Sequence, residues 1–539
     1  MKVLQRFLAC LAVCLALLAP LPADEGHHHG PASGEKLGTV KFPTSCSPAV
    51  RSEFERGVAM LHSFWYEEAE KTFLAVAQKD PDCALAQWGL ALSLYHPLWA
   101  PPDAGQLRRV RSALQTAKAA KHKTPREAAY LTAVEAYYSP DRTDYRDRAL
   151  AYEKAMEQVY LRHPKDREAA AFYALSLLGT ALPSDKTYAN QKKAGAILEK
   201  IFAQQPLHPG VAHYLIHSYD YPALAQRGLD AARRYTKIAP SVPHALHMPS
   251  HIFIRLGHWN DAIASNQDAA QAAREYGHKM GWEGAWDQQL HAMDYLAYGY
   301  LQSGQPAEAR RVLEELSSIK KSHPDNLTSS FAFAAVPARV AIELRQWQEA
   351  AKLEPRPGTA AWAAAMIYWA RAVGAARSGD LDAAQQDVAR LAAARDELQQ
   401  AKQPYWADQV EIQRRSAAAW LAFARDDQAQ ALELMRSSAD LEDSTEKHPV
   451  TPGAITPARE MLGELLIELK RPAEALREYE ASLKNSPNRF NGLYGAARAA
   501  ELAGDTARAR EHYGALLGIC GEDNHQRREL DHARAFAGM

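Results

Sequence analysis

A set of small and aromatic residues recurs along this chain at fixed offsets. After Gly57, an alanine follows twelve residues on, a phenylalanine sixteen on and a proline twenty-four on. After Gly463, alanine, tyrosine and proline stand at the same three offsets. The unit that comes next carries Gly504, Ala509, Tyr513 and Leu516. Units of this kind bury their apolar faces only by stacking on their neighbours, so the pattern restricts the chain to a repeat architecture.

The pattern resembles the tetratricopeptide repeat, a helix–turn–helix of about 34 residues. Small residues let the two helices approach, large residues fill the gap between them, and the proline ends the second helix. We place the first helix of successive units at Val50, Ala84, Pro209, Pro243, Leu290, Phe331, Ala365, Ile412, Thr456 and Phe490. The sequence therefore predicts an all-α fold, an α-α superhelical solenoid of tetratricopeptide-like repeats.

The first 23 residues are typical of a secretory signal peptide. Lys2 and Arg6 precede an apolar run, and a small residue, Ala23, offers a cleavage site. No other stretch has the roughly 18 uninterrupted apolar residues that a membrane helix needs. We expect an exported protein, periplasmic or secreted, with no membrane span in the mature chain.

The landmarks also divide the chain into segments. We expect a signal peptide (1–23), a flexible tail (24–43), an N-terminal repeat pair (44–100), irregular helical pairs (101–208), repeat units with a histidine cluster (209–330), repeat-like helical pairs (331–438), a loop (439–455) and a C-terminal repeat pair with a tail (456–539).

Charge and cysteine content bear on partners and compartment. Without Lys2 and Arg6, 61 basic residues face 64 acidic ones, and no basic stripe dominates a segment. We therefore expect no nucleic-acid partner. Cys46 and Cys83 can pair in an oxidising compartment, or each can be a buried thiol. The sequence leaves both open.

Nine of the 21 histidines lie between positions 208 and 291. His244, His247 and His251 take the second, fifth and ninth places of one repeat, within roughly 60° of one another on a helix. The preceding repeat also carries polar residues at its fifth and ninth places, His213 and His217. The following repeat carries them at its second, fifth and ninth places, His291, Asp294 and Tyr298. Three consecutive repeats thus direct polar side chains at one concave surface.

A pair of histidines four residues apart on a helix can offer two ligands to a metal ion. Two neighbouring helices carry such a pair, so we predict a divalent metal (zinc, copper or iron) bound by His213, His217, His247, His251 and Asp294. Asp220 is a further candidate ligand or ligand-orienting carboxylate. The alternative is polar packing between the inner helices of a tight superhelix.

Other residues of the same face are candidates for an organic ligand. We expect His244, His291, Tyr298, Arg339 and Arg498 to line the groove. An arginine presents a rigid donor fork to a peptide terminus or carboxylate. The alternative for both arginines is a solvated face or an ordinary ion pair between repeats.

Several longer motifs resemble a bacterial class of exported tetratricopeptide-repeat proteins. They are FERGVAMLHSFWYEEAEKTF, DPDCALAQWGLA, HPGVAHYLIHSYD, HALHMPSHIFIRLGHW and NRFNGLYGAARAAELAGD, and the resemblance spans most of residues 42–517. It implies the solenoid fold and no particular reaction. The motif histidines of that class coincide here with His213, His217, His247 and His251.

Three hypotheses for function follow. The first is a non-enzymatic exported binding protein, whose concave groove takes a peptide, a protein or a small ligand, with metal held by the His/Asp cluster. The second is a metal-dependent enzyme, a hydrolase or oxidoreductase, with Asp294 or Asp220 as the base. The third is an assembly scaffold without a small-molecule site. No nucleophile elbow, phosphate loop or dinucleotide fingerprint is present in the sequence.

Overall fold

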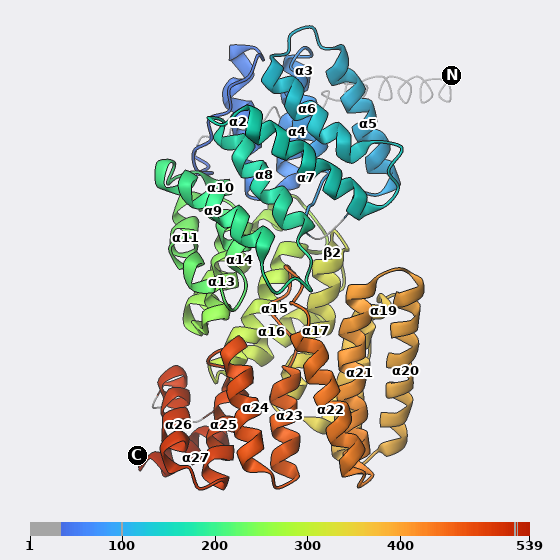
Figure 1. Ribbon diagram of the computed structural model, residues 1–539, viewed down its shortest axis with the longest axis vertical. Coiled ribbons are helices and arrows are strands. Elements are labelled where there is room, and N and C mark those ends of the chain that lie inside the picture. Colours follow the sequence, from blue (N-terminus) through green and yellow to red (C-terminus); the bar gives the residue numbers. More distant parts are fainter. Residues whose placement is uncertain (1–33, 99–100, 522–523, 525, 539) are drawn as a thin grey trace, which may run out of the picture. The chain divides into compact units, whose positions relative to one another are not determined.

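The predicted all-α repeat architecture is confirmed. The computed structural model describes residues 34–98, 101–521, 524 and 526–538, which form helix after helix, each packed on the next. Residues 36–539 make up one structural unit. Figure 1 shows the helices of this unit as successive antiparallel pairs. The expected signal peptide lies outside the described residues.

The first part of the unit runs from a short 3₁₀ turn at Pro48–Val50 to the helix that carries the last histidine of the cluster. Its helices are α2 (Arg51–His62), α3 (Tyr66–Lys79), α4 (Ala84–Ser93), α5 (Ala104–Ala119), α6 (Pro125–Tyr138), α7 (Tyr145–Arg162), α8 (Arg167–Thr180), α9 (Ala189–Gln204), α10 (Pro209–Tyr219), α11 (Ala225–Ile238), α12 (Pro243–His247), α13 (Pro249–Leu256), α14 (Trp259–Lys279) and α15 (Asp287–Gln302).

The second part continues the same pattern to the C-terminal end. Its helices are α16 (Pro306–Ser318), α17 (Leu327–Glu343), α18 (Trp347–Ala350), α19 (Ala361–Ser378), α20 (Leu381–Gln400), α21 (Pro404–Ala424), α22 (Gln428–Asp443), α23 (Ala458–Glu468), α24 (Pro472–Asn485), α25 (Phe490–Leu502), α26 (Thr506–Cys520) and α27 (Arg528–Ala537). Two short strands, β1 (Ala285–Trp286) and β2 (Ser322–His323), pair in parallel beside α15.

The recurring glycines and aromatics explain how the helices approach. The Phe73 ring lies against both Gly57 and Gly89, where an added Cβ would come within 2.9 and 2.4 Å of the ring. The Tyr479 ring lies in the same way against Gly463 and Gly495, at 2.7 and 2.2 Å. An aromatic side chain from the second helix of a unit thus fills the space that two glycines leave on flanking first helices. This is the physical basis of the fixed offsets in the sequence.

Most predicted helix starts lie within a few residues of the observed ones. α4, α10, α12 and α25 begin at the predicted Ala84, Pro209, Pro243 and Phe490. The start placed at Ile412 is wrong, because α21 begins eight residues earlier at Pro404. Proline suits the first turn of a helix, where its missing N–H has no intrahelical partner in any case.

Two connecting segments differ from expectation. Residues 36–43, assigned to a flexible tail, pack on the helices: the Thr39 amide donates to the Leu207 carbonyl at 2.9 Å, and Phe42 is fully buried beside Trp88. The loop expected at 439–455 is shifted, since α22 runs on to Asp443 and α23 begins at Ala458. We call residues 444–457 the covering segment.

Cys46 and Cys83 form a disulfide, which decides between the two alternatives that the sequence left open. It ties the chain just before α2 to the residue that precedes α4. In the described part of the chain, no helix has both the length and the apolar character needed to cross a membrane.

Candidate metal centre

Six buried histidines from three successive repeats meet in the interior of the unit. They are His213 and His217 on α10, His244, His247 and His251 on α12 and α13, and His291 on α15. Each is at most 8% exposed. The register that places the first-helix positions of neighbouring repeats on one face therefore brings these side chains together.

The six histidines form two groups of three. One ring nitrogen from each of His213, His217 and His244 lies within 4.8 Å of the others, and we call this group the first triad. The same holds for His247, His251 and His291, the second triad. Metal–imidazole bonds are about 2.0–2.1 Å long, so nitrogens that share an ion lie at most about 4.2 Å apart, and small side-chain adjustments would bring each triad to that spacing.

The two triads adjoin each other. The ring centroids of His217 and His251 are 5.8 Å apart, and those of His244 and His247 are also 5.8 Å apart. Both of these pairs join one triad to the other. The six rings therefore form one continuous cluster.

Hydrogen bonds fix the tautomers of two second-triad histidines. The His251 Nδ1–H donates to the Asp220 carboxylate at 2.9 Å. The Asn266 amide nitrogen donates to the Ala262 carbonyl, which turns its oxygen toward His247 Nδ1, 2.6 Å away. Both Nδ1 atoms therefore carry protons, and both neutral rings present an unprotonated Nε2. These two Nε2 atoms face each other at 3.0 Å.

The first triad is oriented less completely. His213 Nδ1 donates to the His62 carbonyl at 2.7 Å, so its Nε2 is the unprotonated nitrogen. His217 Nε2 lies 3.1 Å away and can donate its own proton to it. His244 Nδ1 lies 3.1 Å from the side-chain oxygen of Gln288. His213 and His217 can therefore hydrogen-bond to each other as neutral rings, unlike the facing Nε2 atoms of the second triad.

Burial sets the charge of the cluster. It lowers the pKa of all six histidines, and neighbouring imidazoles lower it further for every one of them except His251. For His251 the Asp220 carboxylate opposes the effect of burial, yet the pKa remains below its ordinary value. The rings are therefore neutral at neutral pH, which is the protonation state that binds metal ions.

Asp220 joins the second triad to a group of cations. Its carboxylate accepts from Lys447 Nζ at 2.6 Å and from Arg255 Nε at 2.9 Å, besides His251. Burial alone would raise the pKa of Asp220, but Lys447 and Arg255 outweigh it and hold the pKa well below its usual range. Asp220 therefore remains an ionised acceptor for the His251 N–H, which is the usual partner of a metal-binding imidazole.

The covering segment closes over the cluster. Besides the bond from Lys447 to Asp220, its Val450 carbonyl accepts from the Tyr295 hydroxyl at 3.2 Å, and its Gly453 carbonyl accepts from Arg339 at 3.4 Å. The Tyr295 hydroxyl also lies 3.2 Å from His251 Nε2. His244 and His291 are consequently buried in the cluster rather than displayed on an open groove.

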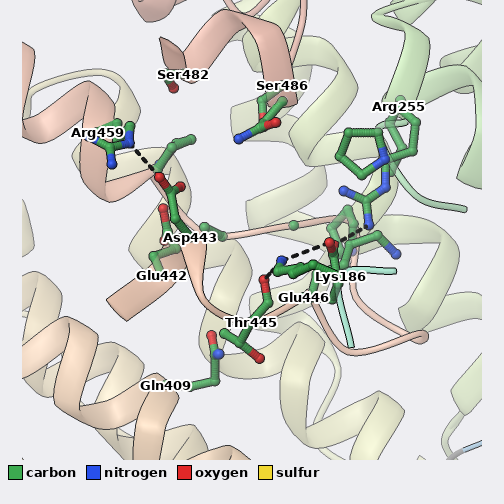
Figure 2. A pocket seen from close by; sticks show the side chains of 18 of the residues that line it. Lys186, Arg255, Gln409, Glu442, Asp443, Thr445, Glu446, Arg459, Ser482 and Ser486 are labelled. Atoms are coloured by element: carbon green, nitrogen blue, oxygen red, sulfur yellow. Dashed lines mark hydrogen bonds and ion pairs between the residues drawn. The ribbon is translucent and has the colours of Figure 1, made fainter. Parts of the chain in front are cut away.

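A cavity of about 350 Å³ is lined in part by residues of the covering segment, among them Thr445 and Glu446 (Figure 2). Lys186, Arg255 and Glu446 converge on it, with the Glu446 carboxylate 2.8 Å from Lys186 Nζ and 3.7 Å from Arg255. Arg255 also pairs with Asp220, so contacts through these two side chains lead from the cavity to His251. A much smaller cavity, about 20 Å³, is lined by His217, Asp220 and Lys447.

The remaining predicted site residues bind other side chains of this protein. Asp294, placed among the metal ligands by the sequence, is ion-paired with buried Arg339 and belongs to neither triad. The Tyr298 hydroxyl accepts from Arg489 at 2.9 Å. Arg498 pairs with Glu501 at 2.6 Å on the same helix, α25. The Arg339 side chain is fully buried, whereas that of Arg498 is 36% exposed.

The sequence reasoning did not find the residues that orient the cluster. Asn266 comes from α14 and Lys447 from the covering segment. Arg255 and Tyr295 lie on α13 and α15, the helices that carry His251 and His291. His62 stacks on Phe172, and its Nε2 also lies 2.8 Å from the Glu168 carboxylate. His208 accepts from the Val211 amide as the N-cap of α10.

Comparisons with known proteins give no family assignment. No family model matches the chain, and no curated protein matches it. Solved structures of human IFIT1 resemble it in part: a dimer with m7Gppp-AAAA and a dimer with PPP-AAAA are each 12% identical, with a TM-score of 0.37. The alignments cover 81% and 86% of this chain and 90% and 89% of those chains. A likeness at this level concerns the helical architecture alone.

One expectation from the sequence is corrected by these structures. We excluded a nucleic-acid partner because the charge is nearly balanced and no basic stripe is present. That exclusion is contradicted by the IFIT1 structures, which hold capped or triphosphate RNA. The RNA belongs to those proteins, and the histidine cluster described above is the site that this chain's own residues build.

Proposed function

We propose that this protein is an exported metal-binding protein of tetratricopeptide-like repeats, in which the second triad holds a transition-metal ion. The observation that supports this most strongly is the facing pair of Nε2 atoms on His247 and His251, 3.0 Å apart. Asp220 and Asn266 hold both protons on the opposite nitrogens.

Without a cation this arrangement would be costly. Two neutral rings with their Nδ1 atoms protonated direct two lone pairs at each other, and neither can donate to the other. Protonating one ring would relieve the contact, but burial lowers both pKa values. A metal ion accepts both lone pairs at once. Two nitrogens bound tetrahedrally at about 2.1 Å lie about 3.4 Å apart, close to the observed spacing.

The donor set restricts the kind of metal. The second triad offers only imidazole nitrogens, which suit zinc, copper, iron and nickel rather than the oxygen-preferring calcium and magnesium. Asp294 is already neutralised by Arg339, so it is not needed as a ligand. Asp220 orients His251 from behind rather than through a bond to the ion.

Export is supported by two independent features. The first 23 residues have the composition of a secretory signal peptide. Cys46 and Cys83 form a disulfide, and disulfides persist mainly in oxidising compartments. We therefore propose a periplasmic or secreted location for residues 24–539.

Elemental analysis tests the proposal directly. Residues 24–539, purified without a histidine tag, should carry at least one transition-metal ion per chain. A His247→Gln/His251→Gln variant should lose that ion while it keeps its helical circular dichroism. His258→Gln is the matched control, because His258 lies outside both triads. A wild-type protein that remains metal-free after reloading would contradict the proposal.

A second candidate function, a metal-dependent enzyme, is favoured by the neighbouring cavity. Arg255 contributes both to this cavity and to the carboxylate that orients His251. A substrate bound there could act on the metal centre only if the covering segment moved, because Lys447 and Val450 lie over the cluster. Turnover of hydrolytic or oxidisable model substrates by the metal-loaded protein, absent from the His247→Gln/His251→Gln variant, would establish it.

A further inference from the structure

We infer that the first triad holds a second metal ion beside the first, and that both ions are copper. This inference rests on the proposed function, since it takes the second triad as a metal site. It adds a second ion, the identity of the metal and the way in which the six histidines are shared.

The first triad has the same donors as the second. Its three imidazoles have ring nitrogens within 4.8 Å of one another, the same limit that holds in the second triad. His213 already presents an unprotonated Nε2, because its Nδ1 donates to the His62 carbonyl. His217 presents the second once its proton moves to Nδ1, a tautomer change that is inexpensive for a neutral ring. The His213 and His217 nitrogens are then 3.1 Å apart, as in the second triad.

The two triads adjoin each other, so ions bound in them would be neighbours. Rings of His217 and His251 are 5.8 Å apart, and so are those of His244 and His247. Aromatic side chains enclose the cluster at both ends. The Phe64 ring lies 4.3 Å from that of His213, and the Tyr295 ring lies 4.6 Å from that of His247. A buried, aromatic-walled pair of three-nitrogen sites is thus shaped for two neighbouring ions.

Charge selects the metal. The six ligands are neutral, and Asp220, the nearest carboxylate on His251, is already paired with Lys447 and Arg255. Two divalent ions would place four uncompensated positive charges in a buried site, which is strongly unfavourable. Two copper(I) ions would bring half that charge, and imidazole suits copper.

The test compares wild-type protein with variants that remove one triad each. Apoprotein 24–539 is loaded with copper(I) under anaerobic conditions, desalted and assayed for copper. We expect two copper ions per chain in the wild type and one each in His213→Gln/His217→Gln and His247→Gln/His251→Gln. The His258→Gln control should retain two.

Each result has a distinct meaning. One copper per wild-type chain would overturn the second ion and leave the proposed function standing. No metal of any kind would overturn both. Loss of both ions from either variant would contradict a separate three-histidine site for each. Retention of zinc in preference to copper, in an equimolar competition, would overturn the choice of metal.

A second measurement needs no variant and so does not depend on their folding. X-ray absorption at the copper edge of the copper(I)-loaded wild type should show a second copper ion as a neighbour of each copper, beside the imidazole nitrogens. A spectrum with imidazole nitrogens and no neighbouring copper would contradict the adjacency of the ions.

Discussion

His247 Nε2 and His251 Nε2 face each other at 3.0 Å across the peptide bond where α12 gives way to α13. Pro249 lies between them and removes one backbone donor, yet Met248 keeps helical dihedral angles, so the two rings stay on one side of the chain. Their orientation is imposed by two partners, Asn266 on α14 and Asp220 after α10. The following predictions test how this arrangement is held and what it contributes.

Asn266→Ala should weaken metal binding without removing a ligand. The substitution takes away the oxygen that keeps the His247 proton on Nδ1. Loss of such a partner typically reduces metal affinity by about 10–100-fold. Competition with a coloured chelator measures the affinity. Gln267→Ala is the matched control, since Gln267 donates to Tyr300 and not to the cluster; equal affinities in the two variants would count against a positioning role for Asn266.

Lys447→Met should loosen the covering segment. Lys447 and Asp220 form a buried ion pair, and removal of one partner of such a pair commonly costs about 3–5 kcal/mol. Arg255 still faces Asp220, so we expect the lower end, about 3 kcal/mol. Proteolysis should become faster within 444–457. Lys321→Met, which breaks an exposed pair with Glu283, should change neither quantity measurably. An unchanged cleavage rate in Lys447→Met would refute the closing role.

Gly495→Ala should lower the free energy of unfolding by disturbing the packing of α25 on α24. The new Cβ would come within 2.2 Å of the Tyr479 ring, and overpacking of this kind typically costs about 1–3 kcal/mol. Gly514→Ala, within α26 and with nothing inside 4 Å of its Cβ, should instead stabilise by about 0.5–1 kcal/mol through helix propensity. Urea denaturation gives both values. Shifts of the same sign would contradict the packing explanation of the fixed offsets.

Acid should destabilise the fold partly through His96. Burial lowers the pKa of His96 to about 4, against an unfolded value of about 6.5. Above pH 6.5 both states are neutral and its full contribution is present. Between pH 6.5 and 4 only the unfolded state takes up the proton, so stability falls as the pH falls.

At pH 5 the loss from this one residue is about 2 kcal/mol. His96→Phe keeps the ring that stacks on Tyr66, with centroids 4.2 Å apart, and removes the titration. The free energy of unfolding should therefore decline less between pH 8 and pH 5 in this variant than in the wild type. Parallel declines would show that His96 is not one of the acid-sensitive groups.

The fold could be predicted from the sequence because the residues that pack the helix pairs together recur at fixed spacings along the chain. Gly57, Gly463 and the aromatic residues sixteen positions after them recur with the helix pairs that they hold together. Helix starts at proline, such as Pro209 and Pro243, were also visible. The start of α21 at Pro404 could not be predicted, because this helix begins eight residues before the position that the repeat period indicates.

The site could be predicted only in part. Histidines at the same places of successive repeats, such as His217 and His251, necessarily approach one another when the repeats stack. Their orientation could not be predicted, since Lys447 lies 227 residues from Asp220 in the chain and no periodicity links them. Asp294 lies at the same repeat position as the histidines, but its carboxylate forms an ion pair with Arg339 from the next repeat. A register position indicates which face a side chain takes, and its partners decide what it does there.

The most direct test of the central claim is a crystal structure of the metal-loaded protein with data collected on both sides of the metal absorption edge. We predict an anomalous peak about 2.0–2.2 Å from Nε2 of both His247 and His251, with His291 as a third ligand. A structure without that peak, in which the two Nε2 atoms remain 3.0 Å apart or one ring has turned to donate to the other, would contradict it.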